Sequence, residues 1–202
     1  MVWTPPATPL VTNLPSITTI MHGTFARRTA SQTEWWEPQG TFARAVNGRV
    51  GDLYTHSDYF FWSGSNTDLA RRQAARDFTD WVNQRLAPGG YLRVICHSHG
   101  GNVALLASNQ DQHTNKLFLL GTPIRTDYIP RMGHIEYIVN IFSPTDHVQT
   151  AGSVGRRRGE GRTLADTNQI SNHCTIDPNM GHSDLHVWSV WQQGGNNFDA
   201  ML

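Results

Sequence analysis

Neither a surplus of one charge nor a long apolar segment marks this sequence. Lysine plus arginine and aspartate plus glutamate number 16 each, so bulk charge indicates neither a nucleic acid nor a membrane surface as partner. No apolar run approaches the ~20 residues of a membrane-spanning helix. The first residues also lack the basic and apolar regions of a secretory signal peptide. We therefore expect a chain that is either cytoplasmic or exported by another route.

Cysteine is scarce, since only Cys96 and Cys174 occur in the chain. Two cysteines settle little about the redox compartment of the protein, although they could in principle pair. We expect Cys96 to end a central strand as a free, buried thiol. The tight backbone expected around Cys96 leaves little freedom for a disulfide with Cys174.

The length of the chain fits one domain with one hydrophobic core, which we expect to span residues 1–202. Seven tryptophans and eight phenylalanines supply large side chains for that core. Proline and threonine are abundant in residues 1–15, which we interpret as an irregular lead-in. Residues 149–168 contain several glycines and arginines and are interpreted as a mobile surface loop.

Segments with strand-like composition alternate with segments of helical periodicity. Strands are expected at 16–21, 58–62, 91–95, 116–120 and 135–142. Helices are expected around 42–46, at 67–86, from the residues after 98 to about 109, and through 188–191. This alternation predicts the α/β class, with a mostly parallel sheet of about six strands and helices on both faces.

The segment Cys96-His97-Ser98-His99-Gly100 lies between the strand expected at 91–95 and a helix of small residues. Such a layout is typical of a nucleophile elbow, in which a serine on a sharp strand-to-helix turn exposes its hydroxyl. Small residues are needed two positions before and after the serine, because the backbone is crowded there. Gly100 meets this requirement, and the compact Cys96 stands where glycine is usual. Ser98 is therefore the candidate nucleophile.

A serine hydroxyl needs a histidine base, and the base needs a carboxylate that orients it. In this architecture the acid and then the base follow the serine along the chain. Asp146 comes directly after the strand expected at 135–142, so we expect it at the same sheet edge as Ser98. Asp127 is the second candidate for the acid. Asp111 fits poorly, because it lies beyond the helix that follows Ser98.

His182 is the first candidate for the base, because it lies in a glycine-containing loop before the last expected helix. His186 is the main alternative, and His173 and His147 come after it. The chain contains ten histidines, so most of them are expected to be structural or surface residues.

An oxyanion hole needs two backbone N–H donors that are held in place before the reaction. The N–H of His99, directly after the candidate nucleophile, is expected to be one of them. The second is expected in the segment His22-Gly23-Thr24, which follows the first strand. Gly23 lets the backbone approach the substrate there, and the N–H of Thr24 is the donor.

Aromatic residues flank this oxyanion segment. Phe25, Trp35 and Trp36 either line a pocket for the acyl group, together with His22 and Gly23, or fill the core beneath a long loop. The sequence favours neither alternative.

Two pairs of closely spaced histidines could serve as zinc ligands, namely His97 with His99 and His182 with His186. Ser183 stands where a metalloprotease carries its catalytic glutamate, and neither pair has a convincing third ligand. Glycine-rich loops that bind nucleotides are also missing. We therefore expect neither a metal nor a cofactor.

Taken together, these segments resemble the α/β-hydrolase superfamily, specifically its compact bacterial lipase- and esterase-like members. The resemblance runs from about Ile17 to Trp191. It rests on the elbow and on Met21-His22-Gly23-Thr24, Phe61-Trp62-Ser63-Gly64-Ser65-Asn66, Leu120-Gly121-Thr122-Pro123, Ser143 to Val148 and Gly181-His182-Ser183. It implies a minimal fold without the early antiparallel edge strands of larger relatives. It also implies Ser98 as nucleophile, Asp146 as acid, His182 as base, and Thr24 and His99 as oxyanion donors.

The function expected from this resemblance is that of a serine hydrolase acting on lipid or short-chain acyl esters. Thioester or amide hydrolysis and a phospholipase-type effector would use the same residues, because fold and triad do not fix the substrate. A noncatalytic binding domain that kept the fold is the alternative of a different kind. No partner protein is indicated.

Overall fold

The computed structural model describes residues 12–28, 31–152, 161–164, 170–177, 179–193 and 197–202, with the backbone alone at 170–173. Within these residues, five parallel strands form one sheet in the order β1-β2-β3-β4-β5. They are β1 (Leu14–Met21), β2 (Leu86–His97), β3 (Thr114–Leu120), β4 (Ile135–Phe142) and β5 (Ile170–Thr175). Their carboxyl ends share one edge of the sheet. The expected α/β class is confirmed, with five strands in place of the expected six or so.

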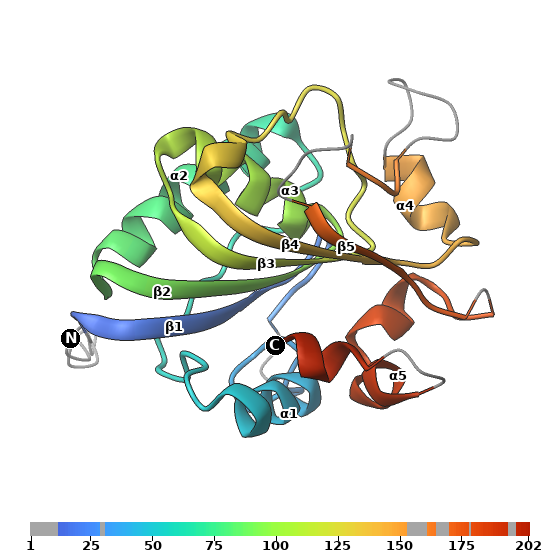
Figure 1. Ribbon diagram of the computed structural model, residues 1–202, viewed down its shortest axis with the longest axis horizontal. Coiled ribbons are helices and arrows are strands. Elements are labelled where there is room, and N and C mark those ends of the chain that lie inside the picture. Colours follow the sequence, from blue (N-terminus) through green and yellow to red (C-terminus); the bar gives the residue numbers. More distant parts are fainter. Residues whose placement is uncertain (1–11, 29–30, 153–160, 165–169, 178, 194–196) are drawn as a thin grey trace, which may run out of the picture.

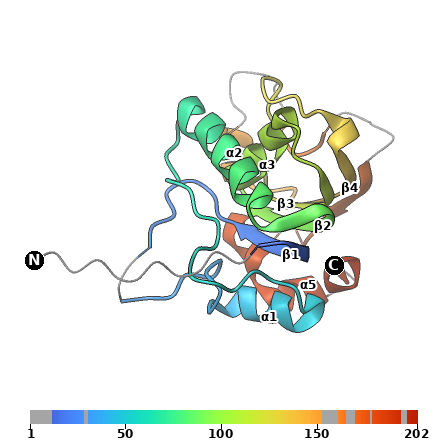
Figure 2. The ribbon, with the colours of Figure 1, turned by 90° about the vertical axis from the view of Figure 1, so that its left-hand side faces the viewer.

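Helices cover both faces of the sheet, as expected. Figure 1 shows α2 (Asp68–Asn83) and α3 (His99–Ala107) on one face and α1 (Thr41–Val50) and α5 (Trp188–Gln192) on the other, and Figure 2 shows the same layers after a quarter turn. The short helix α4 (His147–Gly152) follows β4 at the carboxyl edge. The 3-10 turns of the described residues are η1 (Ser108–Gln110), η2 (Met132–His134), η3 (His182–His186) and η4 (Phe198–Met201).

Side chains of the central strands alternate between two buried clusters, one on each face of the sheet. In β2, Cys96 belongs to the cluster that contains Phe78 of α2. Its neighbour Ile95 belongs to the cluster that contains Phe42 of α1 and Trp191 of α5. A strand that is buried on both faces contains a nearly continuous apolar run, which is why the central strands were recognisable from the sequence.

Helix α2 has clear sequence causes for its start and its orientation. The hydroxyl of Thr67 accepts a hydrogen bond of 3.2 Å from the N–H of Ala70 and so caps the first turn. Ala74 and Phe78 lie four residues apart on the buried face. The helix ends at Asn83 rather than at 86, because the chain already pairs with β1 from Leu86 onward.

Residues 58–62 do not form the expected strand, although their side chains alternate as a strand's would. Phe60 and Trp62 are each 4% exposed, whereas Phe61 is 39% exposed. The backbone of this described segment joins no strand ladder. It is held by side chains instead, and the indole N–H of Trp62 donates a 2.9 Å hydrogen bond to the backbone carbonyl of His22.

Strand β5 was not expected from the sequence. Its residues, Ile-Ser-Asn-His-Cys-Thr, are largely polar, and it pairs only with β4 at the edge of the sheet. An edge strand needs less apolar surface than a central one, so its sequence carries a weaker signal.

The structure describes residues 149–152 and 161–164 of the segment for which the sequence predicts a mobile surface loop. The first four of them belong to α4. Further on, the carbonyl of Gly161 accepts a 2.8 Å hydrogen bond from the N–H of Ile124, and that of Arg162 accepts a 2.6 Å hydrogen bond from the Asn140 side chain. The remainder, 153–160 and 165–168, lies outside the described residues, as does most of the expected lead-in.

Cys96 and Cys174 are both free thiols, the first fully buried and the second half-buried. Among the described residues, no helix combines the length and the apolar character needed to cross a membrane.

Candidate active site

Ser98 lies on the turn that joins β2 to α3. Its φ of 53° and ψ of −133° fall outside the regions that residues with a side chain ordinarily adopt. The Ser98 N–H donates to the carbonyl of Leu120 at 2.8 Å, and the N–H of Gly101 donates to the carbonyl of Ser98 at 3.0 Å. Strain of this kind costs of order 1–3 kcal/mol and persists only where the surroundings enforce it. The turn therefore has the geometry expected of a nucleophile elbow.

Two glycines let the backbone pack closely around Ser98. A Cβ atom at Gly100 would lie 2.5 Å from the carbonyl oxygen of His22 and 2.7 Å from that of Met21, so α3 begins in contact with the end of β1. A Cβ atom at Gly23 would lie 2.7 Å from the Ser98 Cβ and 3.3 Å from its hydroxyl oxygen. The loop after β1 therefore passes directly beside the candidate nucleophile.

His182 and Asp146 are brought together. The Nδ1–H of His182 donates a 2.6 Å hydrogen bond to Oδ2 of Asp146 across 36 residues of sequence. The Asp146 side chain is fully buried, and that of His182 is 11% exposed. A donor at Nδ1 leaves Nε2 of the neutral ring as a proton acceptor. The pair therefore has the polarity that a general base and its orienting acid require.

Asp146 is held by several other groups. Its Oδ1 accepts a 2.9 Å hydrogen bond from the backbone N–H of Gln149. The guanidinium of Arg162 donates to the backbone carbonyls of Asp146 at 3.2 Å and of Ser143 at 3.1 Å. At Gly121, whose φ is +57°, a Cβ atom would lie 3.0 Å from His182 Nδ1 and 3.1 Å from Asp146 Oδ2. The absence of a side chain there leaves room for the pair.

His97 connects the Ser98 turn to the segment that carries His182. The Nε2–H of His97 donates a 3.0 Å hydrogen bond to the backbone carbonyl of His182, and the two rings lie 4.5 Å apart. A second connection runs through the end of β3. The N–H of Ser98 donates a hydrogen bond to Leu120, and the next residue, Gly121, lies against His182 and Asp146. Within the described residues, no hydrogen bond joins the Ser98 hydroxyl to His182. Catalytic contacts of this kind often tighten only when substrate binds.

The two expected oxyanion donors come from the two segments next to the Ser98 side chain, namely the start of α3 and the loop after β1. His99 begins α3, where the first N–H groups of a helix have no partner within it. Thr24 follows Gly23, and the loop is anchored one residue later, where Phe25 donates its N–H to the carbonyl of Gly64 at 2.8 Å. In the part of the chain that the structure describes, neither the Thr24 nor the His99 N–H has an acceptor. Both are therefore available to a developing negative charge.

The alternative acids and bases have other partners or positions. Asp127 forms an ion pair of 3.1 Å with Arg125, and Asp111 pairs with an arginine at an exposed position. His147 is exposed at the start of α4, and the side chain of His173 lies outside the described residues. Within the described residues, the ring of His186 stacks on the ring of Trp35 and forms no hydrogen bond with a carboxylate.

Burial keeps the other histidines near Ser98 uncharged at neutral pH. It lowers the pKa of His22 to about 4 and that of His186 to about 4. Burial, with smaller contributions from two arginines, lowers the pKa of His99 to about 3. The pKa of His97 lies well below its ordinary value for the same reason, with a further contribution from His182. These rings can therefore donate or accept hydrogen bonds without adding charge to the site.

The five residues expected to contact substrate have different positions. His22 and Trp36 are 1% and 3% exposed, and their rings pack on each other at 4.5 Å, so they fill the core beneath the loop. Phe25 is 77% exposed. Trp35 is half-buried and lines a hollow, and Gly23 faces Ser98.

The structure also places the histidine pairs that were considered as zinc ligands, and the side chains of His97 and His99 have different partners. His97 turns toward the backbone of His182, whereas Nδ1 of His99 accepts a 2.9 Å hydrogen bond from the side-chain amide of Asn102. Among the described residues, no three His, Cys, Asp or Glu side chains are grouped as a metal site requires.

Sequence reasoning missed the supporting residues His97, Gly121, Gln149 and Arg162. Gly121 and Gln149 carried usable signals. The former lies in a turn directly after a strand, and the latter lies three residues beyond Asp146, where a side chain can cap a helix start. Arg162 carried none, because its segment has the composition of a surface loop.

No family model and no curated protein matches this sequence.

Proposed function

We propose that this protein is a serine hydrolase that cleaves carboxylic esters through an acyl-enzyme intermediate on Ser98. The observation that carries the proposal is the 2.6 Å hydrogen bond between His182 and Asp146, at the same corner of the sheet as a serine with a φ of 53°. The order serine, aspartate, histidine along the chain and the parallel sheet support membership of the α/β-hydrolase superfamily. Within it, the compact lipase- and esterase-like enzymes are the best fit.

In the proposed acylation step, the Ser98 hydroxyl oxygen forms a bond to the ester carbonyl carbon and its proton moves to Nε2 of His182. The carbonyl oxygen becomes an oxyanion, which the N–H groups of Thr24 and His99 stabilise, each by roughly 3 kcal/mol. Asp146 stays ionised and keeps the imidazolium in place. The bond to the alcohol then breaks, and the alcohol leaves with the proton from His182.

Deacylation uses the same groups in reverse. Water gives a proton to Nε2 of His182 as its oxygen bonds to the acyl carbon, and the oxyanion forms again at the same two N–H groups. Collapse of this intermediate breaks the bond to Ser98, whose oxygen recovers the proton from His182. The products are one carboxylic acid and one alcohol for each ester and water consumed.

Labelling and turnover together test this proposal. A fluorophosphonate probe is expected to label the wild type and not Ser98→Ala. Hydrolysis of p-nitrophenyl esters from acetate to palmitate is expected to fall by a factor of about 10⁴ or more in Ser98→Ala. Ser57→Ala, which changes an exposed serine, is the matched control and is expected to leave both signals intact.

The outcomes also separate the alternative functions. Labelling of Ser98 without turnover of any of these esters would keep the mechanism and move the substrate to a phospholipid, a thioester or an amide. A folded wild type that shows neither labelling nor turnover would contradict the proposal and favour a noncatalytic binding domain.

A further inference from the structure

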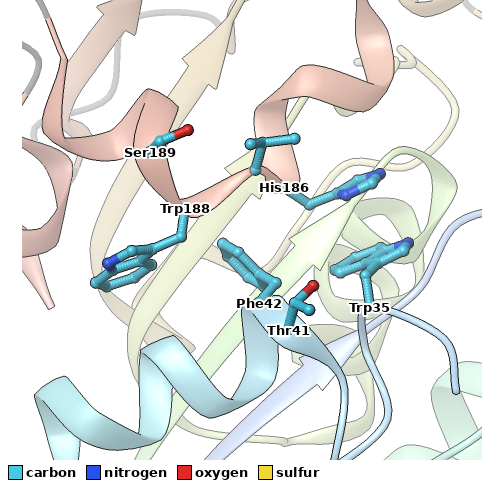
Figure 3. A pocket seen from close by; sticks show the side chains of 7 residues that line it. Trp35, Thr41, Phe42, His186, Trp188 and Ser189 are labelled. Carbon is cyan, nitrogen blue, oxygen red and sulfur yellow. The ribbon is translucent and has the colours of Figure 1, made fainter.

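A hollow of about 420 Å³ lies beside the candidate active site. Figure 3 labels six of the residues that line it, namely Trp35, Thr41, Phe42, His186, Trp188 and Ser189. They come from the loop before α1, from the first turn of α1, from the end of η3 and from the start of α5. The volume falls within the range of pockets that bind small ligands.

Aromatic rings form most of the wall. At one end, Trp35 and His186 stack with centroids 4.0 Å apart and planes 2° apart. Trp188 lies at the other end and Phe42 between them, as Figure 3 shows. The Phe42 ring stands edge-on to both tryptophans, at 5.7 Å from Trp35 and 6.1 Å from Trp188. A flat ring entering the hollow can therefore stack on one wall and meet another edge-on, which are the two arrangements that aromatic pairs prefer.

The wall offers a ligand no charge. Among the described residues, no Asp, Glu, Lys or Arg lines the hollow, and burial keeps His186 neutral. The side-chain hydroxyls of Thr41 and Ser189 can serve a polar substituent. An ionised group would lose its hydration here without gaining a counter-charge, so the hollow favours a neutral ligand.

The hollow is close to the reacting groups. His186 belongs to the same 3-10 turn as His182. The ring of His186 lies 4.8 Å from that of His97, and Trp35 stands edge-on to His97 at 5.6 Å. His97 directly precedes Ser98 in the chain, so its ring connects this wall to the strained turn.

We propose that this hollow, which we call the aryl pocket, binds a neutral aromatic group of the ester that Ser98 cleaves. The inference rests on the proposed function and names its substrate class, namely carboxylic esters that carry an aryl group. Trp35 and Trp188, which line the pocket, are then the aromatic rings available to that group.

Binding can be tested without turnover, in the Ser98→Ala background. Titration with 2-naphthol is expected to give a saturable change in the intrinsic tryptophan fluorescence, because Trp35 and Trp188 line the pocket. A second change, Ser189→Trp, fills the pocket from an exposed position and is expected to abolish saturation. Leu69→Trp introduces the same residue at a 74% exposed position on α2, across the sheet, and is expected to leave binding unchanged.

Selectivity gives a second test in the active protein. We expect Ser189→Trp to lower kcat/KM for 1-naphthyl acetate about tenfold relative to ethyl acetate, mainly through KM. Equal effects on the two esters, or no saturable binding of 2-naphthol, would overturn the aryl pocket even if Ser98 is labelled. Failure of labelling would overturn the proposed function instead, and the 2-naphthol titration would still decide whether the pocket binds an aromatic ring.

Discussion

Asp146 uses both of its carboxylate oxygens to fix the imidazole of His182. Oδ2 accepts the 2.6 Å hydrogen bond from Nδ1–H of His182, and Oδ1 accepts a 2.9 Å hydrogen bond from the N–H of Gln149. A carboxylate held at both oxygens cannot rotate about its terminal bond, so the imidazole plane is held as well. This relationship decides which substitutions should abolish activity and which should leave it.

Asp146→Asn should remove activity while keeping the fold. An amide at this position has the same shape but no charge, so it neither stabilises the imidazolium nor enforces the tautomer with Nδ1–H. We expect kcat for p-nitrophenyl acetate to fall by about 10³ to 10⁴ with little change in melting temperature. Asp127→Asn, which alters a carboxylate paired with Arg125, is the control and should keep most of the activity. Equal losses in the two variants would argue against the assigned roles.

Gly121→Ala should disrupt the Asp146–His182 pair, because the added methyl group would press against both side chains. The added Cβ would lie 2.7 Å from Leu185 Cδ1 and 3.0 Å from His182 Nδ1, at a residue whose φ is +57°. We expect a loss of about 1–3 kcal/mol in the free energy of unfolding together with a drop in kcat. The control is Gly133→Ala, where nothing lies within 4 Å of the added atom, and it should be neutral in urea unfolding and in assay. An active, stable Gly121→Ala protein would contradict this account of the site.

Arg162 should act as a positioning residue for Asp146. Removing its guanidinium in Arg162→Met leaves the carbonyls of Ser143 and Asp146 without these donors. We expect the free energy of unfolding to fall by about 1–2 kcal/mol and kcat to fall more than KM rises. Arg162→Lys should recover part of kcat, because an ammonium can still donate to one carbonyl.

A purely structural role for Arg162 would give a different result. The loss of stability would then appear without a change in kcat, and the lysine variant would recover stability only. Arg76→Met, at an exposed arginine of α2, controls for the removal of a surface charge.

Stability should decrease as the pH falls from about 6.5 toward 4. The pKa of His22 and that of His186 are each about 4 in the folded chain, below the ordinary value of 6.5. Between these values the unfolded chain binds more protons, so acid favours unfolding, by at most about 1.4 kcal/mol per pH unit for each histidine. Urea midpoints at pH 7.5 and 5.5 measure the effect.

Two histidine variants test the origin of that slope. His186→Phe keeps an aromatic ring against Trp35 and removes one titrating group, so the dependence on pH should become shallower. His56→Gln removes an exposed histidine and should leave the slope unchanged. A wild type whose urea midpoint is the same at both pH values would show that burial does not hold these rings neutral.

The central part of the fold could be predicted from the sequence because its strands are buried on both faces. Leu117 to Leu120 is apolar throughout for that reason, and Ile138 to Ile141 is apolar except for Asn140. The same criterion failed at the sheet's margins. It missed the polar edge strand β5. It also assigned a strand to 58–62, where the alternation reflects aromatic packing in a segment that pairs with no strand.

At the candidate site, residues with a role in the expected chemistry could be named from motif and order, whereas those that position them could not. Ser98, Asp146 and His182 follow short signatures at strand ends. The contribution of Arg162 depends on where its loop returns in space, which local composition does not encode. Trp35 and Trp36 are neighbours in sequence, yet one lines the aryl pocket and the other fills the core.

The strained backbone at Ser98 lowers the free energy of unfolding at the same residue that the proposed chemistry requires. Glycine would adopt a φ of +53° with less strain, so a chain selected for durability alone would gain by giving up its hydroxyl here. Under the proposed function, serine supplies at this position the attacking hydroxyl that glycine lacks. The backbone strain at Ser98 thus lies at the residue whose side chain the proposed function requires.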